Sequence, residues 1–186
     1  MKEIDISNLY EKAIKFHKDK NYIIAQKKYE EILNIDPNHI NTLNNLGIIL
    51  FTNKKINDAI NLFKKVISID NKNIDGLNNL GLALFNIKNF VEAESCFKQI
   101  LKKNNKIMST YNNLAIVLKE QGKYNESIDI LKKAIKIDPI NFNLYNNLGT
   151  IFMSIKEYQK FIFFFKKSIE LKSDYVDSIN NIGIAY

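Results

Sequence analysis

The chain has 186 residues, of which 46% are hydrophobic and 25% are charged, a balance typical of globular proteins and unlike that of disordered or fibrous ones. Its single cysteine, Cys96, excludes an intramolecular disulfide and favours a reducing compartment. The net charge of +7 comes from lysine alone. Because the sequence lacks arginine, the residue best suited to bidentate phosphate contacts, we do not expect nucleic-acid binding.

Neither a targeting signal nor a membrane span is evident. The first seven residues mix Lys, Glu and Asp and have no apolar segment of the kind found in secretory signals. The longest apolar runs, residues 46–51 and 161–165, are far too short to cross a bilayer. The sequence therefore predicts a soluble, cytoplasmic protein that does not associate with a membrane.

One five-residue pattern recurs at a constant interval. It reads Leu-Asn-Asn-Leu-Gly at 43–47 and returns, with small changes, at 77–81, 111–115, 145–149 and 179–183. Each copy starts 34 residues after the previous one, which indicates a repeat architecture. Two further series keep this step, one of small residues and one of large ones. They are Ala25, Ala59, Ala93 and Ser127, and Tyr29, Phe63, Phe97, Leu131 and Phe165.

A helix–turn–helix unit of 34 residues with Leu-Gly, Ala, Phe and Pro at these offsets resembles the tetratricopeptide repeat. The resemblance implies an all-α fold, a right-handed and superhelical α-solenoid of stacked helical hairpins. It also implies a lead-in at 1–5, five full repeats, and the first helix of a sixth, truncated repeat at 176–186. The full repeats run 6–39, 40–73, 74–107, 108–141 and 142–175.

The glycine or alanine at the eighth place of a repeat has a packing reason. Glycine inside a helix costs up to about 1 kcal/mol relative to alanine, so its recurrence there implies close contact between two helices. We expect the large residue of the second helix to fill the space beside it. The prolines, Pro37 and Pro139, follow the second helix and end it before the next repeat.

The fifth repeat departs from the pattern at two aromatic residues. Phe161 stands where the other repeats have a small residue, so we expect distorted hairpin geometry there. Phe163 stands where the others have Lys27, Asn61, Ser95 and Asp129, so we expect an exposed ring that contacts a following domain or a second copy of the chain. The apolar segment 176–186 predicts either a longer natural chain or pairing with another chain.

Residues that could carry chemistry do not form a recognisable constellation. The sequence has no glycine-rich phosphate loop and no His/Cys cluster with metal-ligand spacing, so we expect no catalytic residues, no metal and no cofactor. His17 and His39 are expected to be isolated surface histidines, and Cys96 a small packing residue. The chain is therefore not expected to be an enzyme.

The repeated asparagines are the best candidates for a binding site. Asparagine presents an acceptor and a donor side by side, which suits the backbone of an extended peptide. Resemblance to the repeat arms of O-linked N-acetylglucosamine transferase-type proteins implies that the asparagine before Leu-Gly or Leu-Ala forms a ladder on the concave surface. This asparagine ladder is Asn45, Asn79, Asn113, Asn147 and Asn181. The expected groove lining is Asn44, Asn78, Asn112, Asn146, Ile48, Leu82, Ile116, Phe51 and Phe85. The alternative is that these asparagines bond to the backbone of a neighbouring repeat.

The sequence thus predicts a scaffold that binds an extended protein segment in its concave groove. In the alternative, the chain is the substrate-recruiting arm of a larger, glycosyltransferase-type enzyme whose catalytic domain lies beyond residue 186. RNA binding by a related helical-repeat array is disfavoured, because those arrays have a 35-residue period.

Overall fold

The computed structural model describes residues 5–173, and these form ten helices and no strand. A first helix of 13 residues alternates with a second helix of 14 residues. The first helices are α1 Ile6–Lys18, α3 Ile40–Thr52, α5 Ile74–Asn86, α7 Met108–Glu120 and α9 Phe142–Ser154. The second helices are α2 Tyr22–Ile35, α4 Ile56–Ile69, α6 Phe90–Lys103, α8 Tyr124–Ile137 and α10 Tyr158–Leu171.

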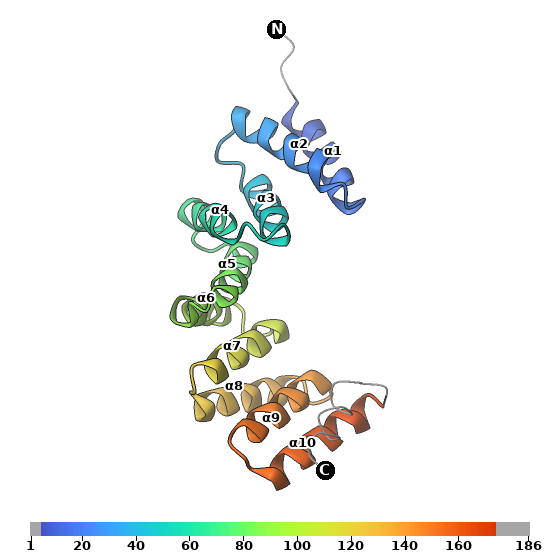
Figure 1. Ribbon diagram of the computed structural model, residues 1–186, viewed down its shortest axis with the longest axis vertical. Helices are drawn as coiled ribbons and strands as arrows, with labels where there is room; N and C mark the ends of the chain where they lie inside the picture. Colours follow the sequence, from blue (N-terminus) through green and yellow to red (C-terminus); the bar gives the residue numbers. More distant parts are fainter. Residues whose placement is uncertain (1–4, 174–186) are drawn as a thin grey trace. The chain divides into compact units, whose positions relative to one another are not determined.

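The chain divides into two compact units, residues 1–89 with α1 to α5 and residues 90–186 with α6 to α10. In the N-terminal unit α1 packs on α2 and α3 on α4, while α2 and α4 each contact the first helix that follows (Figure 1). The C-terminal unit repeats this scheme, with α7 on α8 and α9 on α10. First helices also pack on each other, α3 on α5 and α7 on α9. The predicted all-α fold of stacked hairpins is confirmed.

The helices begin at a constant step along the chain. Each first helix starts 34 residues after the previous one, and we propose that each hairpin is one repeat with the predicted boundaries. The division between the units falls between α5 and α6, inside the third predicted repeat. The predicted lead-in, apart from Asp5, and the predicted sixth repeat at 176–186 lie outside the described residues.

The turn inside each hairpin contains one residue in the left-handed conformation. These residues are also spaced 34 apart, and their φ angles lie between 59° and 73°. Only one of them is glycine, Gly122, although a side chain in this region costs about 1–2 kcal/mol. The others are Lys20, Lys54, Lys88 and Lys156.

The eighth-place glycines lie directly against the large residue of the second helix. A Cβ atom added to Gly47 would sit 2.5 Å from Cε1 of Phe63, and one added to Gly149 would overlap the ring of Phe165. Both rings are buried. The predicted reason for the recurring glycine, a close approach of the two helices filled by an aromatic ring, is therefore confirmed for these two hairpins.

The expected distortion around Phe161 is absent, and that prediction was wrong. Helix α10 is unbroken and has the same 14 residues as the other second helices. Phe161 is 1% exposed and lies edge-on to Phe165, with the ring centroids 5.9 Å apart. On its other side it meets Tyr158 edge-on at 5.7 Å. The hairpin accommodates the larger side chain by packing aromatic rings edge-to-face along α10, and the helix is not interrupted.

Candidate functional site

The asparagine ladder lies on the first helices. Asn45, Asn79, Asn113 and Asn147 are all half-buried, whereas Asn181 lies outside the described residues. Of the asparagines that precede them, two are buried and two half-buried. The buried ones are Asn44 and Asn146, and the half-buried ones are Asn78 and Asn112. The ladder side chains are therefore partly accessible and partly committed to packing.

Hydrogen bonds join the ladder asparagines to the preceding first helix. The side-chain amide of Asn147 donates to the side-chain oxygen of Asn112 at 2.9 Å, and Asn79 donates in the same way to Asn44 at 3.5 Å. The second of these is long and correspondingly weak. The structural alternative thus holds in part, although the acceptor is a neighbouring side chain rather than the neighbouring backbone. An asparagine has two N–H donors and one carbonyl, so each retains groups for a ligand.

Tyr10 takes the place of the missing asparagine in the first repeat. Asn45 donates to its phenol oxygen at 2.8 Å, across the same separation of 35 residues. Burial raises the pKa of Tyr10 and outweighs the opposing effect of the Asn45 hydrogen bond, so the phenol keeps its proton. Its O–H is therefore a donor that a ligand carbonyl could accept. The sequence analysis missed Tyr10, although it stands 34 residues before Asn44.

Residues from α1, α3 and α5 surround a hollow of about 500 Å³, which we call the amide hollow. It brings together four predicted site residues: Asn44, Asn45, Ile48 and Asn79. Four more were not predicted, namely Tyr10, Ile14, Asn41 and Asp75. The repeat pattern held the signal for these, since Ile14 stands one repeat before Ile48, and Asn41 and Asp75 stand one helical turn before ladder asparagines.

A second hollow of about 220 Å³, the apolar hollow, adjoins the first and shares Ile48 and Asn79 with it. The rest of its lining is Phe51, Phe63 and Leu82. Leu82 is 37% exposed, so part of its side chain is available to a ligand. Among the other predicted groove residues, Phe85 is half-buried on α5 and Ile116 is half-buried on α7, and neither lines these two hollows.

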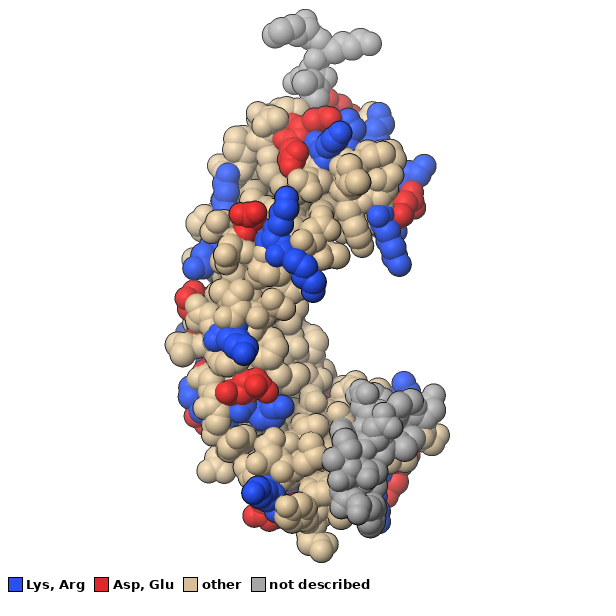
Figure 2. All heavy atoms as spheres, in the orientation of Figure 1, with Lys and Arg blue, Asp and Glu red and all other residues tan. Residues whose placement is uncertain are grey.

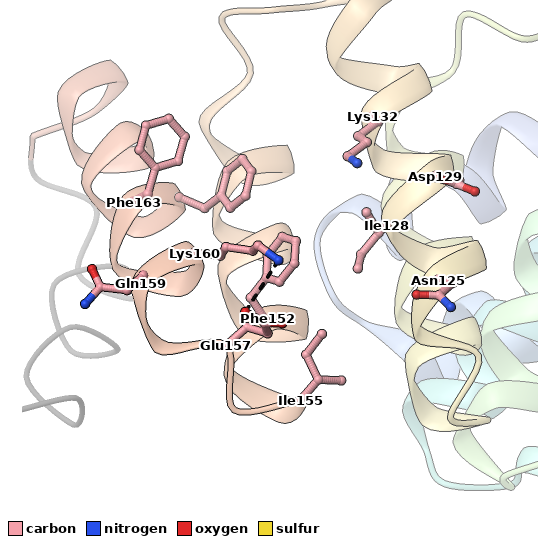
Figure 3. A pocket seen from close by; sticks show the side chains of 11 residues that line it. Asn125, Ile128, Asp129, Lys132, Phe152, Ile155, Glu157, Gln159, Lys160 and Phe163 are labelled. Carbon is pink, nitrogen blue, oxygen red and sulfur yellow. Dashed lines mark ion pairs between the residues drawn. The ribbon is translucent and has the colours of Figure 1, made fainter.

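The C-terminal unit has a larger hollow of about 740 Å³, built by its second helices α8 and α10 and the end of α9 (Figure 3). Phe152, Phe163 and Phe164 line one side, so we call it the phenylalanine hollow. Phe163 is 62% exposed, which confirms the predicted exposed ring and excludes its enclosure within its own repeat. Its contact with another domain or chain stays a prediction.

A buried carboxylate joins α6 to the turn between α7 and α8. Glu94 is 7% exposed and accepts hydrogen bonds from Lys123 at 2.8 Å, Gln121 at 2.7 Å and Lys98 at 2.5 Å. Burial raises the pKa of Glu94, but these hydrogen bonds outweigh it and lower the pKa to about 2. Because both of its oxygens are engaged, we assign Glu94 a structural role. The 34-residue pattern gave no signal for it.

The two histidines differ from expectation. Both are half-buried rather than on the surface, and both make hydrogen bonds. His17 lies 3.2 Å from the phenol oxygen of the buried Tyr29, and burial lowers the pKa of His17. His39 caps α3, accepting from the backbone N–H of Thr42 at 3.3 Å. Cys96 is buried, as expected of a packing residue.

Residues 5–173 hold neither a cluster of metal ligands nor a membrane-spanning helix. Within that range no three His, Cys, Asp or Glu side chains are grouped as metal ligands. No helix there is long and apolar enough to cross a membrane. On the faces of the two units visible in Figure 2, lysines are interspersed with acidic side chains rather than gathered into a basic patch.

The fold and the hollows define an α-solenoid of helical hairpins with candidate binding surfaces. Two family models described as tetratricopeptide repeat match residues 50–114 and 142–175. A third, described as TPR repeat, matches residues 115–156. Together these matches span residues 50–175, and the chain belongs to the tetratricopeptide-repeat family.

Solved structures share this fold at low sequence identity. A crystal structure of MamA superimposes with a TM-score of 0.81 at 23% identity, over 92% of this chain and 93% of that one. A MamA structure from Desulfovibrio magneticus RS-1 gives 0.84 at 19% identity, over 92% and 97%. YrrB, described as a TPR protein with an unusual peptide-binding site, gives 0.79 at 16% identity, over 95% and 91%. No curated protein sequence matches the chain.

Proposed function

We propose that the chain is a protein–protein interaction scaffold that binds an extended peptide segment on the first helices of its N-terminal unit. The observation that carries the proposal is the pair of adjoining hollows, one lined by amides and one apolar, which share Ile48 and Asn79. Such a pair offers polar partners to a peptide backbone and, next to them, a place for an apolar side chain.

The chemistry of each hollow suits one part of a peptide. In the amide hollow, Asn79 keeps a carbonyl and one N–H beyond the bond described, and Tyr10 keeps its O–H. Asn45 also donates to Tyr29, so it offers its carbonyl. Each hydrogen bond to a peptide contributes about 0.5–1.5 kcal/mol net. In the apolar hollow, burying a Leu or Val side chain contributes roughly 1.5–3 kcal/mol. We therefore expect modest affinity that depends most on one apolar ligand residue.

An extended peptide suits the two adjoining hollows because of how its side chains alternate. Successive side chains of an extended peptide point to opposite sides. One side chain can therefore enter the apolar hollow while the backbone of the neighbouring residues hydrogen-bonds to the asparagine side chains. In the C-terminal unit, Asn113 and Asn147 occupy the equivalent repeat positions, and we assign them the same role. YrrB, with its described peptide-binding site, supports this use of the fold.

A substitution in the apolar hollow tests the proposal. A peptide that binds the full chain is first selected from a library of unstructured sequences. Leu82→Asp places a charge in the hollow and should abolish binding of that peptide. Ile69→Asp is the matched control, because Ile69 is 40% exposed at the end of α4 and does not line either hollow. Equal binding by the wild type and both variants would refute the proposal.

The alternative of a transferase arm has no observation in its favour among the described residues or the similar structures. A non-catalytic role agrees with the family. The peptide-binding proposal does not depend on whether the scaffold belongs to a larger enzyme.

A further inference from the structure

The phenylalanine hollow carries an inference that is separate from peptide binding, because it lies in the C-terminal unit, on α8, α10 and the end of α9. Its floor is made by Phe152 and Phe164, whose rings are stacked with centroids 5.3 Å apart. Phe163 stands at its rim, edge-on to Phe164 at 5.1 Å. Figure 3 shows Ile128 and Lys132 pointing from α8 across the hollow towards these rings.

The fold does not require an aromatic ring at position 163. The equivalent residues in the other repeats are polar: Lys27, Asn61, Ser95 and Asp129. Phe163 is nevertheless 62% exposed, so its ring gains little from packing within its own hairpin. Exposed aromatic side chains beside a hollow are typical of interaction surfaces, since a ring buries a large apolar area at a low cost in side-chain entropy.

We propose that this surface pairs with the same surface of a second copy of the chain, each Phe163 entering the phenylalanine hollow of the other. A projecting ring and a hollow side by side are what a two-fold symmetric interface needs, because both copies then contribute the same patch. The hollow has a volume of about 740 Å³ and is open to solvent, so a ring from a second copy can reach it.

The charges around the hollow allow such pairing. The lining has two lysines, Lys132 and Lys160, and two acids, Asp129 and Glu157, so it adds no net charge. Lys160 and Glu157 already form an ion pair at 3.4 Å, and Lys160 also lies over the ring of Phe152 at 5.5 Å. A strongly acidic or basic partner would find no matching field here, whereas a second copy brings the same balance of two lysines and two acids around its own rings.

Sedimentation velocity of the full chain, from low to high micromolar concentration, tests the pairing. We expect a monomer–dimer equilibrium, and Phe163→Ser should raise its dissociation constant at least about tenfold with helicity unchanged. Val91→Ser is the matched control, because Val91 is 73% exposed on α6 and does not line this hollow. That variant should dimerise like the wild type.

Ionic strength provides a second readout. Because the chain carries a net charge of +7 while the hollow is neutral, added salt should leave dimerisation unchanged or strengthen it. A wild type that stays monomeric throughout, as expected if a different protein covers the hollow, would overturn the proposal. So would a Phe163→Ser variant that dimerises as well as the wild type, or a dimer that salt dissociates.

Discussion

Asn147 donates its side-chain amide to the side-chain oxygen of Asn112, 2.9 Å away on the preceding first helix. Because this contact links two successive hairpins, these two asparagines have a structural role. We expect Asn147→Ala and Asn112→Ala each to lower the free energy of unfolding by about 0.5–1.5 kcal/mol. A double-mutant cycle from chemical denaturation should show that the two losses are not additive.

Asn143→Ala is the control for that cycle, since Asn143 is half-buried on the same helix α9 and belongs to neither ladder position. Its effect should stay within about 0.5 kcal/mol. Additive losses for Asn147 and Asn112 would show that the hydrogen bond contributes nothing to stability.

The contact between Gly47 and Phe63 predicts a compensating pair of substitutions. Gly47→Ala brings a methyl group onto the Phe63 ring and should destabilise the chain by about 1–3 kcal/mol, despite the better helix propensity of alanine. The fourth repeat has alanine and leucine at these two places, Ala115 and Leu131, both buried in one core cluster. Adding Phe63→Leu to Gly47→Ala should therefore recover part of the lost stability in thermal unfolding. No recovery would contradict the packing account.

The hydrogen bonds to Glu94 predict a pH dependence. Its pKa is lowered from 4.5 to about 2 in the folded chain, so the carboxylate stabilises the fold above about pH 4.5. This contribution is lost as the pH falls from 4.5 towards 2. At neutral pH, Glu94→Gln should cost about 1–2 kcal/mol, a figure kept low because Lys98 and Lys123 are half-exposed.

Thermal unfolding of the wild type and Glu94→Gln across this pH range makes the comparison. Other carboxyl groups titrate equally in both proteins, so the difference in stability isolates Glu94. It should be constant above about pH 5 and shrink below pH 4.5. A difference that does not change with pH would mean that the Glu94 charge is not stabilised by the fold.

Much of the fold could be read from the sequence because a repeat is a local unit that recurs. A small residue such as Gly47 and a large one such as Phe63 keep their separation in every hairpin, so one pattern predicted many contacts. The prediction of distorted geometry around Phe161 was wrong because the pattern shows only which residue types are usual at a place. It does not show that the Phe161 ring can lie edge-on to Phe165. The division after Asn89 also had no sequence signal.

The candidate site was predicted less completely. The recurring asparagines and Ile48 could be found because they repeat, and the structure brings them to one hollow. Tyr10 and Asp75 stand at places that the repeat pattern marks, but they were missed because their residue types differ from those of the other repeats. Such departures give one part of a repetitive surface its own chemistry. The hydrogen-bond partners of the asparagines depend on how successive helices stack, which a repeat pattern alone does not specify.

Asp75 predicts a preference for basic ligands. Among the described residues it is the only charged one that lines the amide hollow, and the equivalent residues elsewhere are neutral: Ser7, Asn41, Ser109 and Asn143. A bound peptide with a lysine near Asp75 should gain about 0.2–1 kcal/mol over one with glutamine, and the gain should fall as salt is added. Fluorescence anisotropy with the two peptides measures the difference.

Asp75→Asn should remove that preference. Asp58→Asn is its control, because Asp58 is likewise an exposed acid in the first turn of a helix, α4, but does not line the hollow. This control should keep the preference. If Asp58→Asn also removes it, the effect comes from net charge and not from the hollow.

In the proposed function, the half-buried asparagines of the N-terminal unit hold a peptide backbone. The most direct test is calorimetric titration of a selected extended peptide into the wild type and into the double variant Asn45→Ala/Asn79→Ala. We expect the variant to keep its helical circular dichroism and to bind about 1–3 kcal/mol more weakly, since two hydrogen-bonding side chains are lost. Unchanged affinity, or a loss of binding only in proportion to a loss of helicity, would contradict the account.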